Sequence, residues 1–183
     1  NNRYTSIIIK IIVMTQQTIN LYQYGYRDAK TYITATLFVV GNILLPQLAH
    51  TVHMGGMIWL PIYFFTLIGA YKYGWRVGLL TAVASPVINH LLFGMPPVAM
   101  LPAILTKSVV LALAGGYAAK RFQTVSIVTL TGVVLFYQLV GSVAEWGYTG
   151  SMAAALQDVR IGLPGMALQI VGGYLVIRYL LRK

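Results

Sequence analysis

Only a few side chains in this sequence could do chemistry, because the chain has 13 Lys and Arg residues, three acids, three histidines and no cysteine. Lys107 lies inside an apolar run, where an unpaired ammonium costs at least about 2.5–3.5 kcal/mol. It therefore needs a polar cavity or a carboxylate, and Glu145 and Asp158 are the acids available. In a cavity, its charge would neutralise a ligand's carboxylate or phosphate. Alternatively, the long side chain reaches the end of its helix and binds nothing.

A binding site of this kind could draw on two further groups of residues. Glu145 could accept hydrogen bonds beside an aromatic wall formed by Trp146 and Tyr148, although such rings are equally typical of membrane-interface anchors. Asn89 and His90 could bind a ligand, or Asn89 could bridge two helices.

Two more aromatic residues and two histidines are candidates. Trp59 and Tyr63 lie one helical turn apart and could line the same site, although lipid contact or core packing is the ordinary role of such residues. His50 and His53 are three residues apart, a spacing that places two side chains on one side of a helical turn. Two histidines without an acidic neighbour do not predict a metal centre. We therefore expect no metal site, and we count His53 among the candidate ligand-binding residues.

The motifs of common catalytic sites are absent from the sequence. It contains no Walker A phosphate loop, no His-Glu-x-x-His and no Gly-x-Ser-x-Gly. No nucleophile lies beside a base, and no two carboxylates lie together, within one apolar run. We therefore expect neither an enzyme nor a bound cofactor.

The composition indicates where these side chains reside. The chain is 58% hydrophobic and 9% charged, whereas soluble domains carry about 25% charged residues. Apolar runs of about 20 residues, each long enough to cross a bilayer as a helix, recur along it. We therefore predict an all-α, polytopic membrane bundle with six transmembrane helices. The predicted spans are approximately 31–48, 57–73, 79–93, 100–119, 125–144 and 161–181.

The basic residues predict the orientation of this bundle. The net charge of +10 reports Lys and Arg gathered at one membrane face, so no nucleic-acid partner is needed to explain it. With six spans, eleven of the 13 basic residues lie on the side that holds both termini, and only Arg160 lies on the other. Lys and Arg accumulate in cytoplasmic loops, so we expect both termini in the cytoplasm. The outer face then holds the histidines and two of the acids, and we expect those side chains to converge on a hollow.

The chain is expected to form one membrane domain with an extension in front of it. Met14 precedes a polar stretch and is typical of a natural start, so residues 1–13 are interpreted as a non-native extension. Residues 1–30 are assigned as this extension and an interfacial lead-in, and residues 31–183 as a single six-helix membrane domain.

The layout from residue 30 to residue 183 resembles a known family. The features that carry the resemblance are six spans in a chain of this size, Leu60-Pro61 before the Gly74 and Gly78 turn, Lys120-Arg121, and Gly162-Leu-Pro-Gly165. They are similar to the S components, the substrate-binding membrane subunits, of energy-coupling factor (ECF) transporters.

The resemblance implies uptake of a vitamin or another micronutrient across a bacterial plasma membrane. An S component captures its small water-soluble ligand near the outer face and associates with a membrane coupling subunit and two cytoplasmic ATPases. Family members dock the coupling subunit through an Ala-x-x-x-Ala motif on the first helix. The nearest match here is Thr31-x-x-x-Ala35. Ligand contacts differ between members, so the pocket residues proposed above rest on depth and polarity alone.

A structural membrane scaffold without a ligand, of the rod-shape-determining kind, is the alternative function. It predicts a bundle without an outer cavity, in which Glu145 or Asp158 holds Lys107. A binding subunit predicts a cavity instead. The mixture of Lys, Glu, Asn, His and aromatic residues would suit a flat heterocycle that carries a carboxylate or a phosphate.

Overall fold

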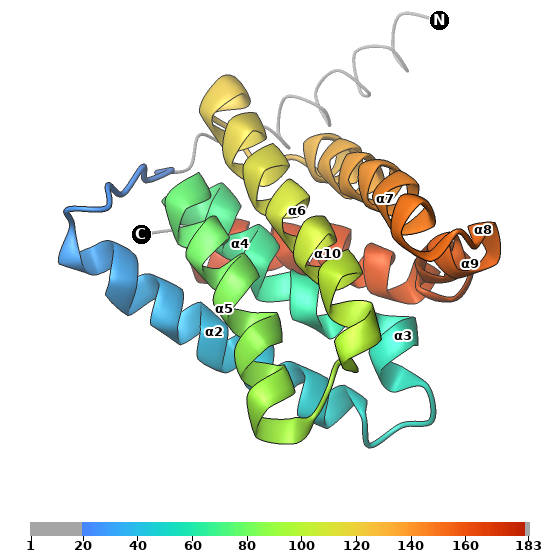
Figure 1. Ribbon diagram of the computed structural model, residues 1–183. Coiled ribbons are helices and arrows are strands. Elements are labelled where there is room, and N and C mark those ends of the chain that lie inside the picture. The colour runs from blue at the N-terminus through green and yellow to red at the C-terminus, as the bar shows by residue number, and fades with distance from the viewer. Residues whose placement is uncertain (1–19, 182–183) are drawn as a thin grey trace, which may run out of the picture.

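A computed structural model describes residues 20–181 of the chain, and these residues are helical without any strand (Figure 1). The expected all-α class is confirmed. The expectations for residues 1–13 lie outside the described residues. The longer helices are α2 (Ala29–Ala49), α4 (Phe64–Tyr73), α5 (Trp75–Phe93), α6 (Leu101–Phe122), α7 (Ile127–Thr149) and α10 (Leu163–Leu175). The short elements are α3 (Gly55–Trp59), η1 (Pro61–Tyr63), η2 (Val98–Met100), α8 (Met152–Ala155), α9 (Gln157–Ile161) and the π-helical turn η3 (Val176–Leu180), which continues α10.

Five of the six predicted spans are helices long and apolar enough to cross a bilayer. They are Ala29–Ala49, Trp75–Phe93, Val98–Phe122, Ile127–Thr149 and Leu163–Leu180. A multi-pass membrane protein is consistent with these helices, whose outer faces carry many exposed large apolar side chains.

The second predicted span, 57–73, is not one continuous helix. Leu60 has a left-handed conformation (φ 45°, ψ 47°) between α3 and η1. Pro61 follows it, and a residue before proline is disfavoured in the α conformation. The remaining helix α4 has 10 residues and is therefore about 15 Å long, half the thickness of the hydrocarbon core. The expectation of six continuous spanning helices is wrong at this segment.

The helices form two layers. In Figure 1, α2, α5, α6 and α7 follow one another across the front layer, with α4 and α10 behind them. Leu67, Ile68, Ala70 and Tyr71 of α4 are fully buried, because α2, α5, α6 and α10 all pack against this helix. A helix that is apolar on every side is stable only when neighbours cover it, and α4 occupies such a position.

Glycines allow the closest helix contacts. A Cβ at Gly116 of α6 would lie 2.8 Å from Cα and 2.9 Å from the backbone nitrogen of Trp75, at the start of α5. Likewise, a Cβ at Gly78 of α5 would lie 2.8 Å from Cα of Ala70. Gly78 and Gly116 therefore serve packing within this chain, as small residues do between membrane helices.

The predicted docking residues are buried inside the bundle. Thr31 has no exposed surface and Ala35 is 4% exposed. The Thr31 hydroxyl donates to the carbonyl of Gly25 over 2.6 Å, which ties the start of α2 to the segment before it. Neither residue provides an exposed surface for a partner in this conformation, so the predicted docking motif requires correction.

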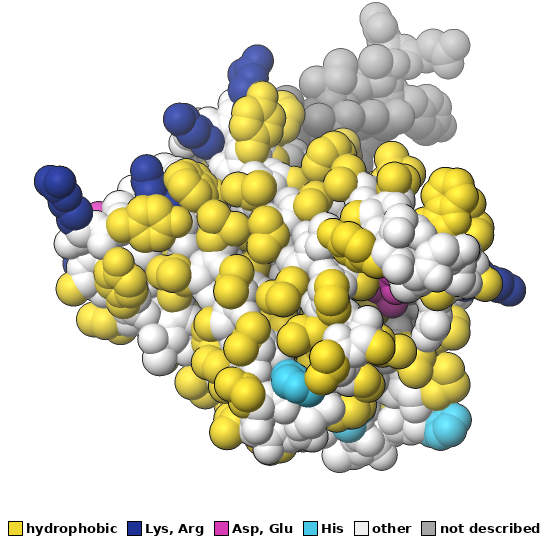
Figure 2. Space-filling view, viewed as in Figure 1, with side chains coloured by type: hydrophobic (Ala, Val, Ile, Leu, Met, Phe, Trp, Pro, Cys, Tyr) yellow, Lys and Arg dark blue, Asp and Glu magenta, His cyan; other side chains and the backbone are white. Residues whose placement is uncertain are grey.

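Charged side chains separate toward the two ends of the bundle. Figure 2 shows most of the visible Lys and Arg side chains at the end where α2 begins and α6 ends, and the histidines at the opposite end. This is the segregation that the sequence predicts.

Gly116→Ala should lower the free energy of unfolding by about 1–3 kcal/mol, because a methyl group there overlaps the backbone of Trp75. Gly132→Ala is the matched control, since no atom lies within 4 Å of a Cβ at that exposed position of α7. That control should be neutral or stabilising by up to about 1 kcal/mol. Thermal unfolding in detergent, followed by circular dichroism, measures both. Equal effects at the two glycines would contradict this packing.

Candidate functional site

The candidate site contains an ammonium held by two carboxylates. Lys107 Nζ lies 2.6 Å from Glu145 Oε2 and 2.7 Å from Asp158 Oδ2. The Lys107 side chain is 2% exposed, and the carboxylate side chains are 17% and 21% exposed. The predicted need of Lys107 for a carboxylate is therefore met by both available acids. The alternative, in which its side chain extends to the helix end and binds nothing, is wrong.

Three separate elements bring the triad of Lys107, Glu145 and Asp158 together. Lys107 is on α6, Glu145 is near the end of α7, and Asp158 is on the short helix α9. A Cβ at Gly141, one turn before Glu145 on α7, would overlap Cγ of Lys107. Gly141 thus makes room for the lysine stem between α6 and α7. The Asp158 carboxylate accepts a hydrogen bond from Lys107 across these elements.

The triad has a formal charge of −1, since one ammonium faces two carboxylates. Lys107 therefore neutralises acids of its own chain, and its charge is not free to neutralise a ligand anion. Each carboxylate uses one oxygen for Lys107, and the other oxygen makes no hydrogen bond to another described residue. The triad can therefore still accept hydrogen bonds.

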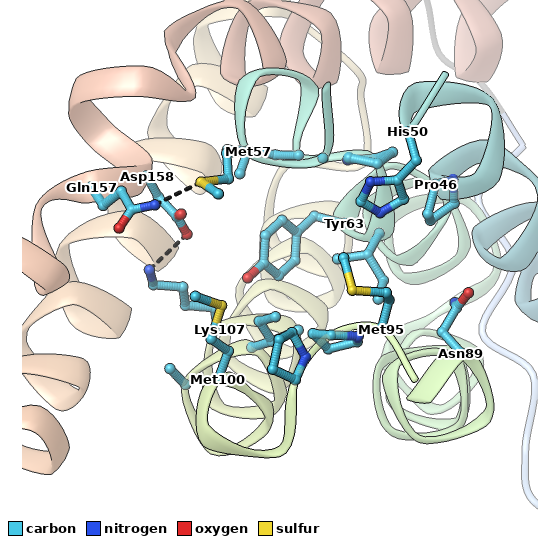
Figure 3. Close-up of a pocket in the computed structure, with 18 of the residues that line it drawn as sticks. Pro46, His50, Met57, Tyr63, Asn89, Met95, Met100, Lys107, Gln157 and Asp158 are labelled. Atoms are coloured by element: carbon cyan, nitrogen blue, oxygen red, sulfur yellow. Dashed lines mark hydrogen bonds and ion pairs between the residues drawn. The ribbon is translucent and has the colours of Figure 1, made fainter. Parts of the chain in front are cut away.

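A cavity of about 300 Å³ extends from the triad across the bundle (Figure 3). Its walls come from the end of α2, from α3 and η1, from the loop between α5 and α6, and from the first turns of α6. The wall is mostly apolar, with Met, Pro, Leu and Ile side chains between the polar groups. Mostly apolar walls with a few fixed polar groups are typical of small-molecule sites.

Asn89 lines the far side of this cavity and has an unpaired hydrogen-bond acceptor. The side chain is 2% exposed, and its Nδ2 donates to the carbonyls of Asn42 (2.9 Å) and Ser85 (3.0 Å). Two carbonyl acceptors require the nitrogen on their side, so Oδ1 must occupy the other position. That oxygen is buried and has no hydrogen-bond partner among residues 20–181. Asn89 thus joins helices, as one alternative predicted, and also lines the cavity.

Tyr63 presents a second unpaired group to the cavity. The residue is 1% exposed, and its ring packs against Tyr137 with centroids 5.4 Å apart. Figure 3 shows the ring projecting into the space between Lys107 and Met95. Its hydroxyl is buried without a hydrogen-bond partner in the part of the chain that the structure describes. A buried polar group left unpaired costs about 1–3 kcal/mol, and it is normally satisfied by water or a ligand.

Lys107, Glu145, Asn89 and Tyr63 are the four predicted ligand-binding residues that line the cavity. The other five do not line it. The side chain of His90 is engaged in the loop, with Nδ1 2.8 Å from the carbonyl oxygen of Pro96. Trp59, Trp146, Tyr148 and His53 are exposed.

The predicted aromatic wall beside Glu145 does not form part of the cavity. Trp146 and Tyr148 are 47% and 61% exposed, on the outside of α7. The Tyr148 hydroxyl lies 3.2 Å from the Thr106 hydroxyl, and Tyr148 does not line the cavity. Trp59 points away because the helix breaks at Leu60, so the one-turn spacing to Tyr63 no longer places both side chains on one face.

Several lining residues were missed by the sequence patterns. Four methionines and Gln157 line the cavity, as does His50, which its spacing to His53 brought into consideration only as a metal ligand. Gln157 Nε2 donates to Met57 Sδ over 2.7 Å, which joins α9 to α3. The Gly-Met-Pro-Pro break after α5 was a visible signal for a loop, but a loop signal does not say that Met95 faces a cavity.

Gly141→Ala should displace Lys107 from its carboxylates and lower the free energy of unfolding by about 1–3 kcal/mol. Gly147→Ala, on the same helix, is the matched control because no atom lies within 4 Å of its Cβ position. Intrinsic fluorescence during thermal unfolding measures the difference. A Gly141→Ala protein as stable as the control would contradict the tight fit of Lys107 against α7.

Lys107→Met should destabilise the protein by about 3 kcal/mol, because it leaves two acids close together without their cation. The triple variant Lys107→Met, Glu145→Gln, Asp158→Asn should recover most of this loss, since it contains no unbalanced charge. Lys120→Met, at the far end of α6, serves as the control. Denaturant titration of the four proteins measures the effect, and a failure of the triple variant to recover stability would count against a mainly electrostatic cause.

Comparison with models of known protein families, with curated proteins and with solved structures found no match to this chain. The interpretation of the site therefore depends on its own geometry: an ion triad, a cavity and two buried polar groups without partners.

Proposed function

We propose that this chain is the substrate-binding subunit of an ECF-type uptake transporter and captures a small water-soluble vitamin or other micronutrient. The observation that carries the proposal is the cavity of about 300 Å³, whose lining residues include Asn89 and Tyr63, each with a buried polar atom that has no partner among the described residues. A molecule bound in the cavity could satisfy the unpaired atoms of these two lining residues.

In this proposal the chain crosses a bacterial plasma membrane six times. The five long helices supply five crossings, and the broken segment of α3, η1 and α4 supplies the sixth. Non-helical backbone is tolerated at membrane depth where protein covers it. This condition supports the proposal, because Leu60 is 4% exposed and a Cβ at Gly165 of α10 would overlap the Trp59 carbonyl. The basic end then faces the cytoplasm and the cavity opens toward the outside.

The energy for uptake would come from partner proteins. The proposal assigns ATP hydrolysis to two cytoplasmic ATPases and force transmission to a membrane coupling subunit. Because Thr31 and Ala35 are buried, a coupling subunit that binds α2 would contact the exposed side of that helix, which includes Ile33 and Leu37.

The structural scaffold is the second candidate function, and one observation favours it. Glu145 and Asp158 hold Lys107 in place, as a scaffold without a ligand predicts. A scaffold leaves the cavity without a role, whereas a small molecule would fill it and could pair with Asn89 and Tyr63. We therefore place ligand binding first.

Thermal unfolding of the detergent-purified chain against a panel of water-soluble vitamins tests the proposal. A true ligand at 100 times its dissociation constant should raise the free energy of unfolding by about 2.7 kcal/mol. Tyr63→Phe should weaken that ligand about tenfold without loss of stability, because its hydroxyl has no partner to lose. Tyr117→Phe, an exposed position on α6, should change nothing. Folded protein that no panel member stabilises would favour the scaffold.

A further inference from the structure

We infer that the cavity binds a flat ring that carries N–H donors and is neutral or cationic, such as an amino- or amidino-substituted ring, rather than a carboxylate or phosphate. The inference rests on the proposed function, because it assumes that the cavity holds a small molecule. It reverses the ligand charge that Lys107 alone predicted.

The triad disfavours an anion at one end of the cavity. Its formal charge is −1, and Lys107 is the only Lys or Arg among the described residues that line the cavity. A ligand carboxylate would compete with Glu145 and Asp158 for one ammonium and would add a third negative charge. A cationic donor would instead balance the excess charge and use the second oxygen of a carboxylate. Charge-assisted hydrogen bonds of this kind are stronger than neutral ones.

At the other end of the cavity, Asn89 needs a hydrogen-bond donor from the ligand. Its orientation is set by the two carbonyls that accept from Nδ2, so the atom that this lining residue leaves unpaired is an acceptor. An oxygen acceptor cannot bind a carboxylate or phosphate oxygen without a proton between them. A ligand N–H satisfies Asn89 Oδ1 directly, and the Tyr63 hydroxyl between the two ends can donate or accept.

The space between these groups suits a small aromatic body. Met54, Met57, Met95 and Met100 line the cavity together with Pro97 and Ile104. Thioethers are polarizable and make favourable contacts with aromatic rings. The volume of about 300 Å³ lies at the lower end of the range for small-molecule sites. Figure 3 shows this space between Lys107 and Asp158 on one side and Asn89 on the other.

Benzamidine, benzamide and benzoate test the inference, because they share one ring and similar size but differ in charge and donors. Isothermal titration calorimetry on the full chain in detergent should show benzamidine binding at least tenfold more tightly than benzoate, with benzamide between them. Asp158→Asn should weaken benzamidine about tenfold and benzamide less than twofold, because Lys107 then faces Glu145 alone and the excess charge is lost.

Asp28→Asn is the matched control. It makes the same chemical change at an acid exposed before α2, outside the cavity, and it should leave all three affinities unchanged. If Asp158→Asn does not fold, Glu145→Gln makes the same test and retains the pair of Lys107 with Asp158.

Three results would overturn the inference. The first is tightest binding of benzoate, which would still support a ligand-binding cavity and so leave the proposed function in place. The second is an equal loss of benzamidine affinity in Asp28→Asn and Asp158→Asn, which would show a general charge effect. The third is the absence of binding by all three probes to folded protein at millimolar concentration. The vitamin panel tests the proposed function separately, because its larger ligands need not carry a cationic group.

Discussion

A single ammonium inside an apolar bundle is the constraint on which the rest of the site depends. Lys107 is buried, so its charge must be balanced where it lies, and Glu145 and Asp158 balance it from two other elements. The two acids lie 38 and 51 residues further along the chain. The ion pairs of Lys107 therefore join α6, α7 and α9, and this triad forms one end of the cavity. Because two acids serve one base, the same requirement leaves that end with an excess negative charge.

A polar network fixes the opposite end in a similar way. Asn42 Nδ2 donates to the hydroxyls of Thr66 (3.0 Å) and Ser85 (3.2 Å), and Asn42 Oδ1 accepts from the backbone of Phe65 (3.2 Å). Its carbonyl in turn accepts from Asn89. Because α2, α4 and α5 share these bonds, the packing of three helices determines the orientation of Asn89. A fully connected buried network of this kind specifies one arrangement of the helices.

The helix break at Leu60 places Tyr63 between these two ends of the cavity. A continuous helix through this segment would keep Trp59 and Tyr63 one turn apart on one face. The left-handed residue before Pro61 separates them, so Trp59 is exposed while Tyr63 enters the core between the triad and Asn89. Besides the triad, the cavity lining thus includes Asn89 and Tyr63, whose buried polar atoms without partners retain hydrogen-bonding capacity. This combination of rigid support and unused capacity is the main physical argument for a binding function over a scaffold.

Local patterns in the sequence were sufficient to predict the all-α class, five of the long apolar helices, the separation of charges and the need of Lys107 for a carboxylate. These properties follow from composition, helical periodicity and the cost of an unpaired charge, all of which act within one segment. Only the tertiary structure decided that both acids bind Lys107, that Trp146 faces outward and that Thr31 is buried. Each of these depends on how a helix is rotated about its axis and on which distant helix lies beside it. Contacts between distant segments determine that rotation, and a pattern within one segment does not contain them.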